Sequence, residues 1–250
     1  MKLGYIPDAP DPRDRLLVDS PIAGAEPLLN ADSIEWRGFD SPRVQRFNSC
    51  VGQSIAAAAF LCAAIAGQPI TFPSALWPYA VSRLLDAPRS PMHDDGCRPR
   101  LAMMWCRDRG LVREDLWLET PMNVNAVPPL DAFSTGDCAR LQAFYRIESG
   151  VGSGDLIRAA LRRGYCPIFA ITVDSKFEQL GRGVYDAPGG TVRGGHMMTI
   201  IGWSAALDAF LVRNTWGKSW GDSGYGWVSG AFLERAARDV YVISAAPEVR

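Results

Sequence analysis

The sequence predicts an α+β protein with two lobes, a helical lobe followed by a β-rich lobe, and a cleft between them. Two observations predict this arrangement. The first half of the chain carries long apolar segments with helix start and stop signals, whereas the segments after a proline-rich loop at residues 121–129 are short, β-branched and separated by turn residues. The 250 residues, of which 48% are hydrophobic, allow a substantial core in one domain or in two closely packed lobes.

Residues 1–33 are expected to form an extended N-terminal arm, because five prolines fall within the first 30 residues. The first helix of the helical lobe should be buried on all sides, since it is almost entirely apolar. Pro78 should kink the second helix or delay its start. The three helices of this lobe, which spans about residues 45–120, are predicted over 50–66, 73–85 and 98–109.

The β-rich lobe is expected over about residues 140–250. A helix over residues 155–163 should begin this lobe, with Ser153 as its cap and Gly164 as its stop. Short strands are then predicted over residues 167–173, 196–203, 210–213, 226–229 and 240–244. The two lobes together would make residues 34–250 a single domain that follows the arm.

Composition argues against several classes of partner. A net charge of −1 and a pI of about 6.1 give no reason to expect a nucleic acid or a membrane surface as partner. The longest apolar run, residues 55–66, is too short to cross a bilayer, and residues 1–30 lack the apolar segment of a secretory signal. We therefore expect a cytoplasmic protein, or one exported by a non-classical route, with its cysteines reduced.

Cys50 is the candidate nucleophile. It falls in the first turn of the first predicted helix, where free backbone N–H groups and the positive end of the helix dipole favour a thiolate. A buried core cysteine is the alternative, which is the interpretation we prefer for Cys62, Cys106 and Cys166.

His196 and Asn214 are the candidate base and the group that orients it. His196 is one of two histidines, and the small Gly195 before it would let a substrate backbone approach closely. Asn214 follows 214 − 196 = 18 residues later, and its neutral amide oxygen could hold one imidazole nitrogen while the other faces the thiol. In isolation, His196 could be a core residue and Asn214 a turn residue.

The context of Asn214 decides between these alternatives. Two Trp-Gly pairs and a Gly-Tyr follow it within residues 213–227, and the chain order is Cys, His, Asn. This pattern resembles the papain/cathepsin family of cysteine peptidases, and the Cys–His separation of 196 − 50 = 146 residues agrees with that family. The resemblance covers roughly Trp36 to the end of the chain and is greatest for bacterial members that have no long prosegment.

The resemblance implies a papain-like fold with a β-barrel-like second lobe and a thiol protease that hydrolyses peptide bonds through a thioester acyl-enzyme. It also implies a peptide or protein substrate, no cofactor or metal, a monomer, and a proteinaceous inhibitor as a further partner. Trp216 would cover the His–Asn hydrogen bond, and Gly96 would pair with substrate backbone.

Two positions depart from the family pattern. Gln45 is the candidate oxyanion donor, but it lies 50 − 45 = 5 residues before the cysteine, where family members have six. Asn48 or Gln53 could donate instead. Val51 stands where the family commonly has a tryptophan, which affects the packing between the lobes.

The sequence also allows other functions. The same triad could catalyse acyl transfer, deamidation or isopeptide cleavage, because a fold does not fix the acceptor. A catalytically silent binding module is a further alternative. His93, with two aspartates and two cysteines nearby, matches no standard zinc spacing, so a surface loop is preferred there. The arm could strap the lobes together or lie over the cleft.

Overall fold

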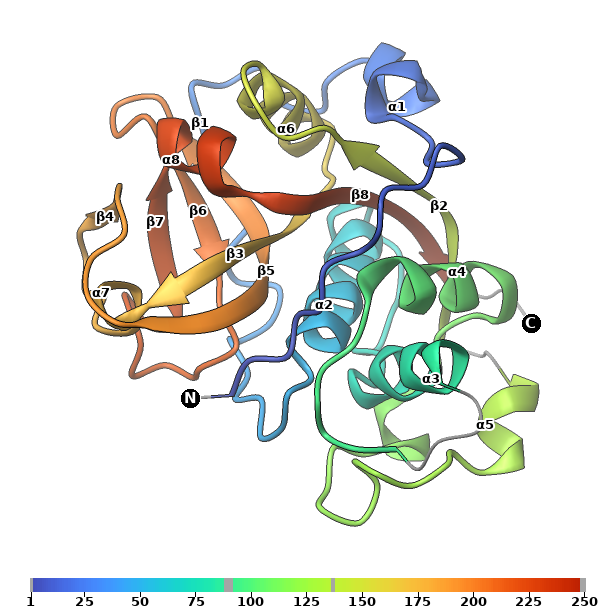
Figure 1. Cartoon of the computed structure of the whole chain (residues 1–250). Coiled ribbons are helices and arrows are strands. Elements are labelled where there is room, and N and C mark those ends of the chain that lie inside the picture. The colour runs from blue at the N-terminus through green and yellow to red at the C-terminus, as the bar shows by residue number, and fades with distance from the viewer. Residues whose placement is uncertain (1, 88–91, 136–137, 248–250) are drawn as a thin grey trace.

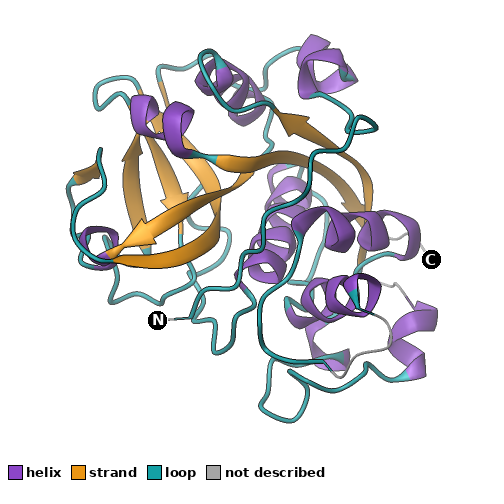
Figure 2. Ribbon diagram, viewed as in Figure 1, coloured by secondary structure: helices purple, strands orange, loops and turns teal. Residues whose placement is uncertain are grey.

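The computed structural model describes residues 2–87, 92–135 and 138–247. Figure 1 labels the elements, and Figure 2 separates helices from strands. The helical elements are η1 (Leu17–Asp19), α1 (Pro21–Gly24), α2 (Cys50–Ile65), α3 (Leu76–Asp86), α4 (Pro99–Arg109), η2 (Glu114–Leu116), α5 (Leu130–Thr135), α6 (Ser153–Arg162), α7 (Ser175–Glu178) and α8 (Gly230–Ala236). The strands are β1 (Ser33–Glu35), β2 (Ala139–Ile147), β3 (Ile168–Asp174), β4 (Val184–Tyr185), β5 (Val192–Ser204), β6 (Ala209–Arg213), β7 (Tyr225–Ser229) and β8 (Arg238–Pro247).

The strands form one sheet in the order β2-β8-β3-β5-β6-β7-β4, and β1 pairs with β5. Neighbouring strands are antiparallel except β4 and β7, which are parallel. The long strands β5 and β8 bend strongly, so the sheet wraps around its own core (Figure 1). Within the described ranges the two ends of this order do not pair, so the sheet stays open rather than closing as a barrel.

Helix α2 lies at the centre of the molecule, as its apolar sequence predicts. It packs against β5 and β8 on the sheet side and against α3 and α4 on the helical side. All but three of its sixteen residues are buried. Gly52 allows α2 to approach the start of α3 closely, because a Cβ atom on this residue would overlap the carbonyl oxygen of Ala75 just before α3. The α+β prediction is confirmed, with α2 joining the two halves.

The hydrophobic core has two main parts. One lies among α2, α3 and α4 and includes Trp77 and Met103. The other fills the inner face of the sheet and includes Phe169, Phe210 and Phe232. The C-terminal strand β8 contributes to both parts, which ties the helical side to the sheet.

Most predicted elements agree with the structure to within a few residues. Helix α3 begins only at Leu76, which places Pro78 in its first turn, where a missing N–H costs no hydrogen bond. Strand β2 was not predicted, although its side chains alternate between buried and exposed. The arm is not extended throughout, because η1 and α1 interrupt it.

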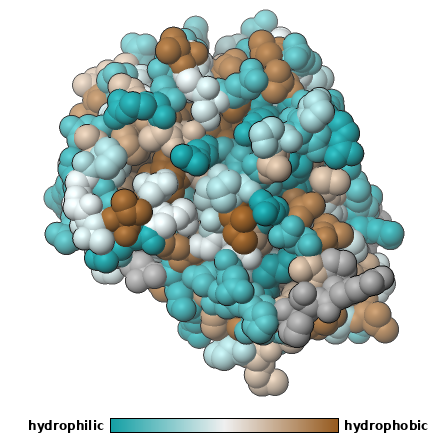
Figure 3. Space-filling model, viewed as in Figure 1, coloured by the Kyte–Doolittle hydropathy of each residue, from teal (hydrophilic) through white to brown (hydrophobic). Residues whose placement is uncertain are grey.

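The arm crosses the front of the molecule between the sheet and the helices (Figure 1). Tyr5 forms a β-bridge with Cys97 on the helical side, and Leu16 forms one with Arg146 of β2. Leu17 and Ile22 are buried in the sheet-side core. On the face in view, hydrophilic and hydrophobic residues are intermixed (Figure 3). No helix in the described part of the chain has the length and apolarity that crossing a bilayer requires.

Candidate active site

His196 and Asn214 lie on neighbouring strands of the sheet. His196 is in β5, and Asn214 directly follows β6, which pairs with β5. Their side chains meet at a distance of 2.8 Å between Nε2 and Oδ1, and both residues are fully buried. The Asn214 side-chain oxygen also accepts a hydrogen bond from the backbone N–H of Thr215 at 2.7 Å. The backbone of the next residue therefore holds the Asn214 side chain in place.

Trp216 covers this pair. Its ring stacks on the imidazole of His196 with centroids 4.6 Å apart and an angle of 19° between the planes. The other imidazole nitrogen, Nδ1, has no hydrogen-bond partner among the described residues. One side of the ring is therefore held and shielded, whereas Nδ1 is free to take or give a proton.

Cys50 is the first residue of α2 and faces the same strand. Its sulfur accepts hydrogen bonds from the backbone N–H groups of Met197 and Val51. Met197 directly follows His196, so the thiol lies against the part of β5 that carries the imidazole. The fold thus brings together the helix start and the histidine from positions 146 residues apart in sequence (196 − 50).

Burial keeps both groups neutral in this state. It raises the pKa of the Cys50 thiol to about 12 and lowers the pKa of His196 to about 4, because a charged form loses its hydration. The backbone N–H groups that donate to the thiol, and the Asn214 oxygen that accepts from the ring N–H, oppose these shifts only partly. The neutral thiol and the neutral imidazole are therefore the favoured forms here, and Nδ1 of His196 makes no hydrogen bond to the Cys50 sulfur in the described part of the chain.

Gln45 reaches this site despite its short spacing. Its backbone N–H donates to the carbonyl of Thr215 at 2.8 Å, and its side-chain oxygen accepts from the Thr215 hydroxyl. Its Nε2 donates to the carbonyls of Lys2 at 3.0 Å and Phe47 at 3.0 Å. It also donates to the carbonyl of Leu3 at 3.3 Å, so the donor expected for an oxyanion is directed at backbone carbonyls, two of which belong to the arm.

The arm contacts several of these residues, Gln45 and Trp216 among them. The indole N–H of Trp216 donates to the carbonyl of Lys2 at 3.2 Å. The N–H of Cys97 donates to Gly4 at 2.9 Å, and the N–H of Tyr5 donates to Gly195 at 3.4 Å. Gly96 and Gly195 flank this segment, because a Cβ on either would overlap the backbone of Gly4 or the side chain of Tyr5.

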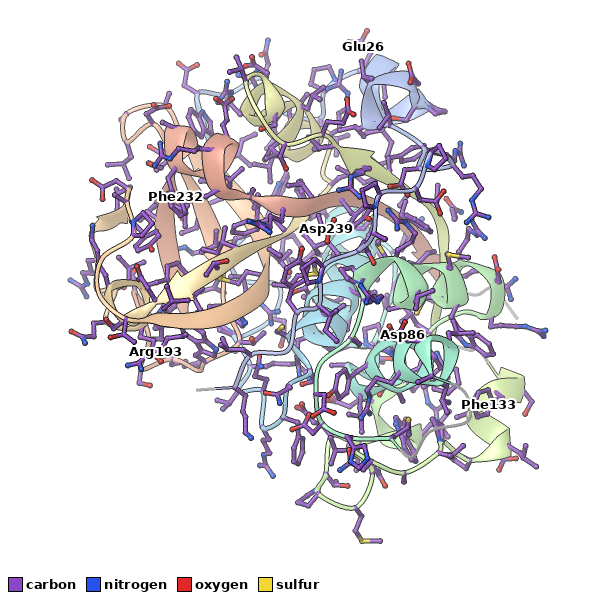
Figure 4. The ribbon with its side chains drawn as sticks, in the orientation of Figure 1. Glu26, Asp86, Phe133, Arg193, Phe232 and Asp239 are labelled. Atoms are coloured by element: carbon purple, nitrogen blue, oxygen red, sulfur yellow. The ribbon has the colours of Figure 1, made fainter. Side chains whose placement is uncertain are left out.

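A polar cluster anchors the arm beyond the cysteine. The hydroxyl of Tyr5 donates to Asp239 at 2.6 Å, and the N–H of Asp8 donates to the same oxygen at 2.8 Å. The carboxylate of Asp8 accepts from the hydroxyl of Tyr241 at 2.9 Å and from the N–H of Arg100 at 3.0 Å. Asp239 lies where β8 passes behind the arm (Figure 4).

Comparison with known proteins identifies the family of the chain. The model of the papain family cysteine proteases matches residues 89–236, which is more than half of the chain and includes His196, Trp216 and Asn214. The chain belongs to the papain family of cysteine proteases. The matched range begins after Cys50, so it does not include that residue.

Solved structures of the family have the same fold. Xylellain, a cysteine protease from Xylella fastidiosa, aligns with a TM-score of 0.81 over 99% of this chain and 96% of its own, at 22% identity. The bromelain protease from Ananas comosus, in complex with the E64 inhibitor, aligns with a TM-score of 0.69 over 86% of this chain and 99% of its own, at 16% identity.

Curated relatives in the family come from a virus and from eukaryotes. An uncharacterized peptidase C1-like protein of Acanthamoeba polyphaga mimivirus is 26% identical over 61% of this chain and 52% of its own length. The cathepsin B-like protease 1 of Arabidopsis thaliana is 29% identical over 52% of this chain and 30% of its own length. The matches thus span about half or less of these relatives.

The structure places every site residue expected from sequence in one region, namely Cys50, His196, Asn214, Gln45, Gly96, Gly195 and Trp216. Sequence reasoning missed Tyr5, Asp8 and Asp239, whose roles depend on contacts between distant parts of the chain. It also missed Glu119, which contacts the start of α2. No patterned motif surrounds any of these four residues.

His93 lies in an exposed loop, as preferred from sequence. No group of three or more His, Cys, Asp or Glu side chains in the described ranges is arranged to hold a metal ion. All six cysteines lie buried in the described part of the chain, and none of them is in a disulfide there. Asn48 and Ser49 do not cap α2 with their side chains, because Asn48 bonds to Asp94 and Ser49 bonds to Glu119.

Proposed function

We propose that this chain is a cysteine peptidase that hydrolyses peptide bonds through Cys50, His196 and Asn214. The observation that carries the proposal is the His196–Asn214 hydrogen bond of 2.8 Å, with the opposite ring nitrogen unpartnered and the Cys50 sulfur held by the next residue of the same strand. An oriented base beside a thiol at a helix start is what a thiol nucleophile requires.

In the proposed reaction the Cys50 thiolate attacks the carbonyl carbon of a peptide, and Gln45 Nε2 with the Cys50 N–H stabilises the oxyanion. The intermediate collapses to a thioester while His196 gives its proton to the leaving amine. Water then attacks the thioester with His196 as the base, which releases the acid and restores the thiol. Asn214 keeps the ring oriented throughout, and the chain acts as a monomer without a cofactor.

The arm makes the described state a latent one under this proposal. Carbonyls of residues 2 and 3 already accept from the Gln45 donor that an oxyanion would need. Burial away from water also leaves both the Cys50 thiol and the His196 imidazole neutral. Departure of the arm would admit substrate and water and restore the ion pair.

Labelling of Cys50 tests the chemistry. Iodoacetamide or an epoxide inhibitor should modify Cys50 faster than Cys62 once the arm is released, and the rate should depend on pH. A Cys50→Ala protein is the control. Equal rates at both cysteines, independent of pH, would favour the catalytically silent binding module, and a peptide library would then show no cleavage.

Gly4→Ala is the variant that should release the arm in the 250-residue chain. Gly4 has a φ of +124°, and a Cβ there would overlap the backbone of Asn48. We expect the rates of Cys50 labelling and peptide cleavage to rise about tenfold or more. Steric overlap of this kind costs about 1–3 kcal/mol, which here would weaken the docking of the arm. Gly24→Ala is the matched control, because that arm glycine has open space around it. Equal activity of the two variants would show that the arm does not block the site.

A further inference from the structure

The loop between Gln45 and Cys50 has no glycine, yet its ends carry the donor and the nucleophile of the proposed reaction. Only residues 46–49 separate the two. Gln45 is fixed by Thr215 at one end, and α2 begins at the other. Two carboxylates from distant segments of the chain, Glu119 and Asp94, hold the loop itself.

Glu119 contacts the loop and the helix start together. One of its oxygens accepts from the hydroxyl of Ser49, the residue before Cys50. The other accepts from Nε2 of Gln53 at 2.9 Å, which is in the first turn of α2. The backbone N–H of Arg46 also donates to this carboxylate. Glu119 therefore joins three points around the nucleophile, and Ser49 and Gln53 are both buried.

Asp94 holds the middle of the loop from the helical side. Its Oδ1 accepts the N–H of Asn48 at 2.8 Å and the hydroxyl of the buried Tyr79 at 2.7 Å. Its backbone carbonyl also accepts from the Asn48 side chain. The same Tyr79 oxygen accepts the N–H of Gly96 at 3.2 Å. Asp94 thus connects the loop to α3, and Glu119 is the only described carboxylate that connects it to α2 itself.

We propose that Glu119 is a positioning residue for catalysis, which holds residues 46–49 and the first turn of α2 so that the Cys50 sulfur, the Cys50 N–H and the Gln45 amide keep a fixed spacing. This inference rests on the proposed peptidase function. Glu119 does not touch the reacting atoms, and it acts through Ser49, Gln53 and Arg46.

The physical reason is the geometry that the oxyanion requires. Donors must lie within hydrogen-bond distance of the position that the oxyanion will occupy, and a misplacement of about 1 Å can cost about a hundredfold in rate. A short loop without glycine has few conformations that meet this demand. Three donors that converge on one carboxylate fix the distance from the loop to the helix, because each is on a different residue.

The test compares variants of Glu119 in the 250-residue chain that carries Gly4→Ala. Glu119→Gln keeps the size of the side chain but replaces one acceptor oxygen with a donor, so it cannot accept from both Ser49 and Gln53. Glu119→Asp keeps the charge but shortens the reach. Asp115→Asn is the matched control, since it removes a carboxylate from the same segment at a side chain that is 69% exposed.

Turnover of a fluorogenic peptide is measured per active site, with sites counted by an epoxide titrant so that unfolded protein does not contribute. We expect kcat to fall about 10- to 100-fold in Glu119→Gln and in Glu119→Asp, with KM changed less than about threefold. Asp115→Asn should match the parent. An unchanged kcat per titrated site with a lowered Tm would mean that Glu119 only stabilises the fold, and the proposal would be wrong.

A second measurement separates this proposal from the peptidase function. The rate of Cys50 alkylation by iodoacetamide is followed against pH in the same variants. If the first turn of α2 loosens, the N–H groups of Val51 and Cys50 that lower the pKa of the thiol lose their alignment, so the midpoint should move to higher pH in both Glu119 variants and stay unchanged in Asp115→Asn. Arg46 and Asp94 also act on Glu119 and stay unchanged in both variants. If no peptide is cleaved by the parent, identical midpoints in all variants would still overturn the role of Glu119.

Discussion

At the scale of single residues, the site depends on the orientation of one imidazole. Asn214 holds the ring of His196 at one edge, and Trp216 covers one face of the ring. These two contacts fix the direction in which the remaining nitrogen, Nδ1, points. Because both partners come from the segment after β6, a single turn controls the base. The two Trp-Gly pairs supply the bulk and the backbone freedom for that turn, and Gly217 has a φ of +78°.

Asn214→Ala should lower kcat about 10- to 100-fold, because the ring loses its orientation while the thiol and the oxyanion donors stay. The buried Nε2 of His196 would also be left without a partner, which costs about 1–3 kcal/mol. Steady-state kinetics and thermal unfolding of the arm-released protein check both effects. Full activity after this substitution would mean that Asn214 does not orient the base.

At the scale of elements, the close packing of α2 against α3 sets the position of the nucleophile. Gly52 is the third residue of α2, and it faces the carbonyl of Ala75 and the side chain of Tyr79. Tyr79 in turn supports Asp94 and the loop before Cys50. A change in the spacing of the two helices would therefore be transmitted to the catalytic loop.

Gly52→Ala should destabilise the protein, although alanine usually stabilises a helix relative to glycine by up to about 1 kcal/mol. Here the added Cβ would overlap the Ala75 carbonyl, and such overpacking costs about 1–3 kcal/mol. Gly24→Ala, in α1 with open space around it, is the control and should be neutral or stabilising. Denaturant unfolding of both variants gives the comparison, and a stable Gly52→Ala protein would contradict the role of this contact.

The elements also show what sequence can and cannot predict. The unbroken apolar run predicts α2, and the apolar residues after Gly195 predict β5. Both elements are buried, and a hydrophobic sequence is enough to indicate a buried element. Motifs indicated Cys50, His196 and Asn214, since their local context is specific. The bond between Tyr5 and Asp239 joins residues 239 − 5 = 234 positions apart, and nothing local to either residue indicates it. Contacts of this kind depend on how the lobes and the arm pack.

At the scale of the whole molecule, the arm couples the two lobes and the site. It contacts the helical side at Cys97 and Arg100, and the sheet side at Gly195 and Asp239. Arg100 also forms an ion pair with Asp14 of the arm, and Arg146 forms ion pairs with Asp14 and Asp239. Release of the arm would therefore break a network of charges that lies apart from the catalytic residues.

This network makes docking of the arm depend on pH. Burial, with the nearby Asp239 carboxylate, raises the pKa of Asp8 from 3.8 to about 6, and the Tyr241 hydroxyl and Arg100 oppose the shift. The docked arm therefore binds a proton more tightly than the released arm does. Docking is most favourable below the ordinary pKa of the carboxyl and weakens as pH rises through about 6, by on the order of 2–3 kcal/mol.

We expect the arm of the unsubstituted chain to be less protected from hydrogen exchange at about pH 7.5 than at about pH 4.5, after correction for the intrinsic rate. The amides of Tyr5 and Ile6 report this directly, because both donate hydrogen bonds in the docked state. Asp8→Asn mimics the protonated carboxyl and should keep the arm equally protected at both values. Peptide cleavage should follow the same order, with the unsubstituted protein gaining activity between the two pH values relative to Asp8→Asn. A greater protection at the higher pH would show instead that the ionised Asp8, through Arg100, strengthens the docking of the arm.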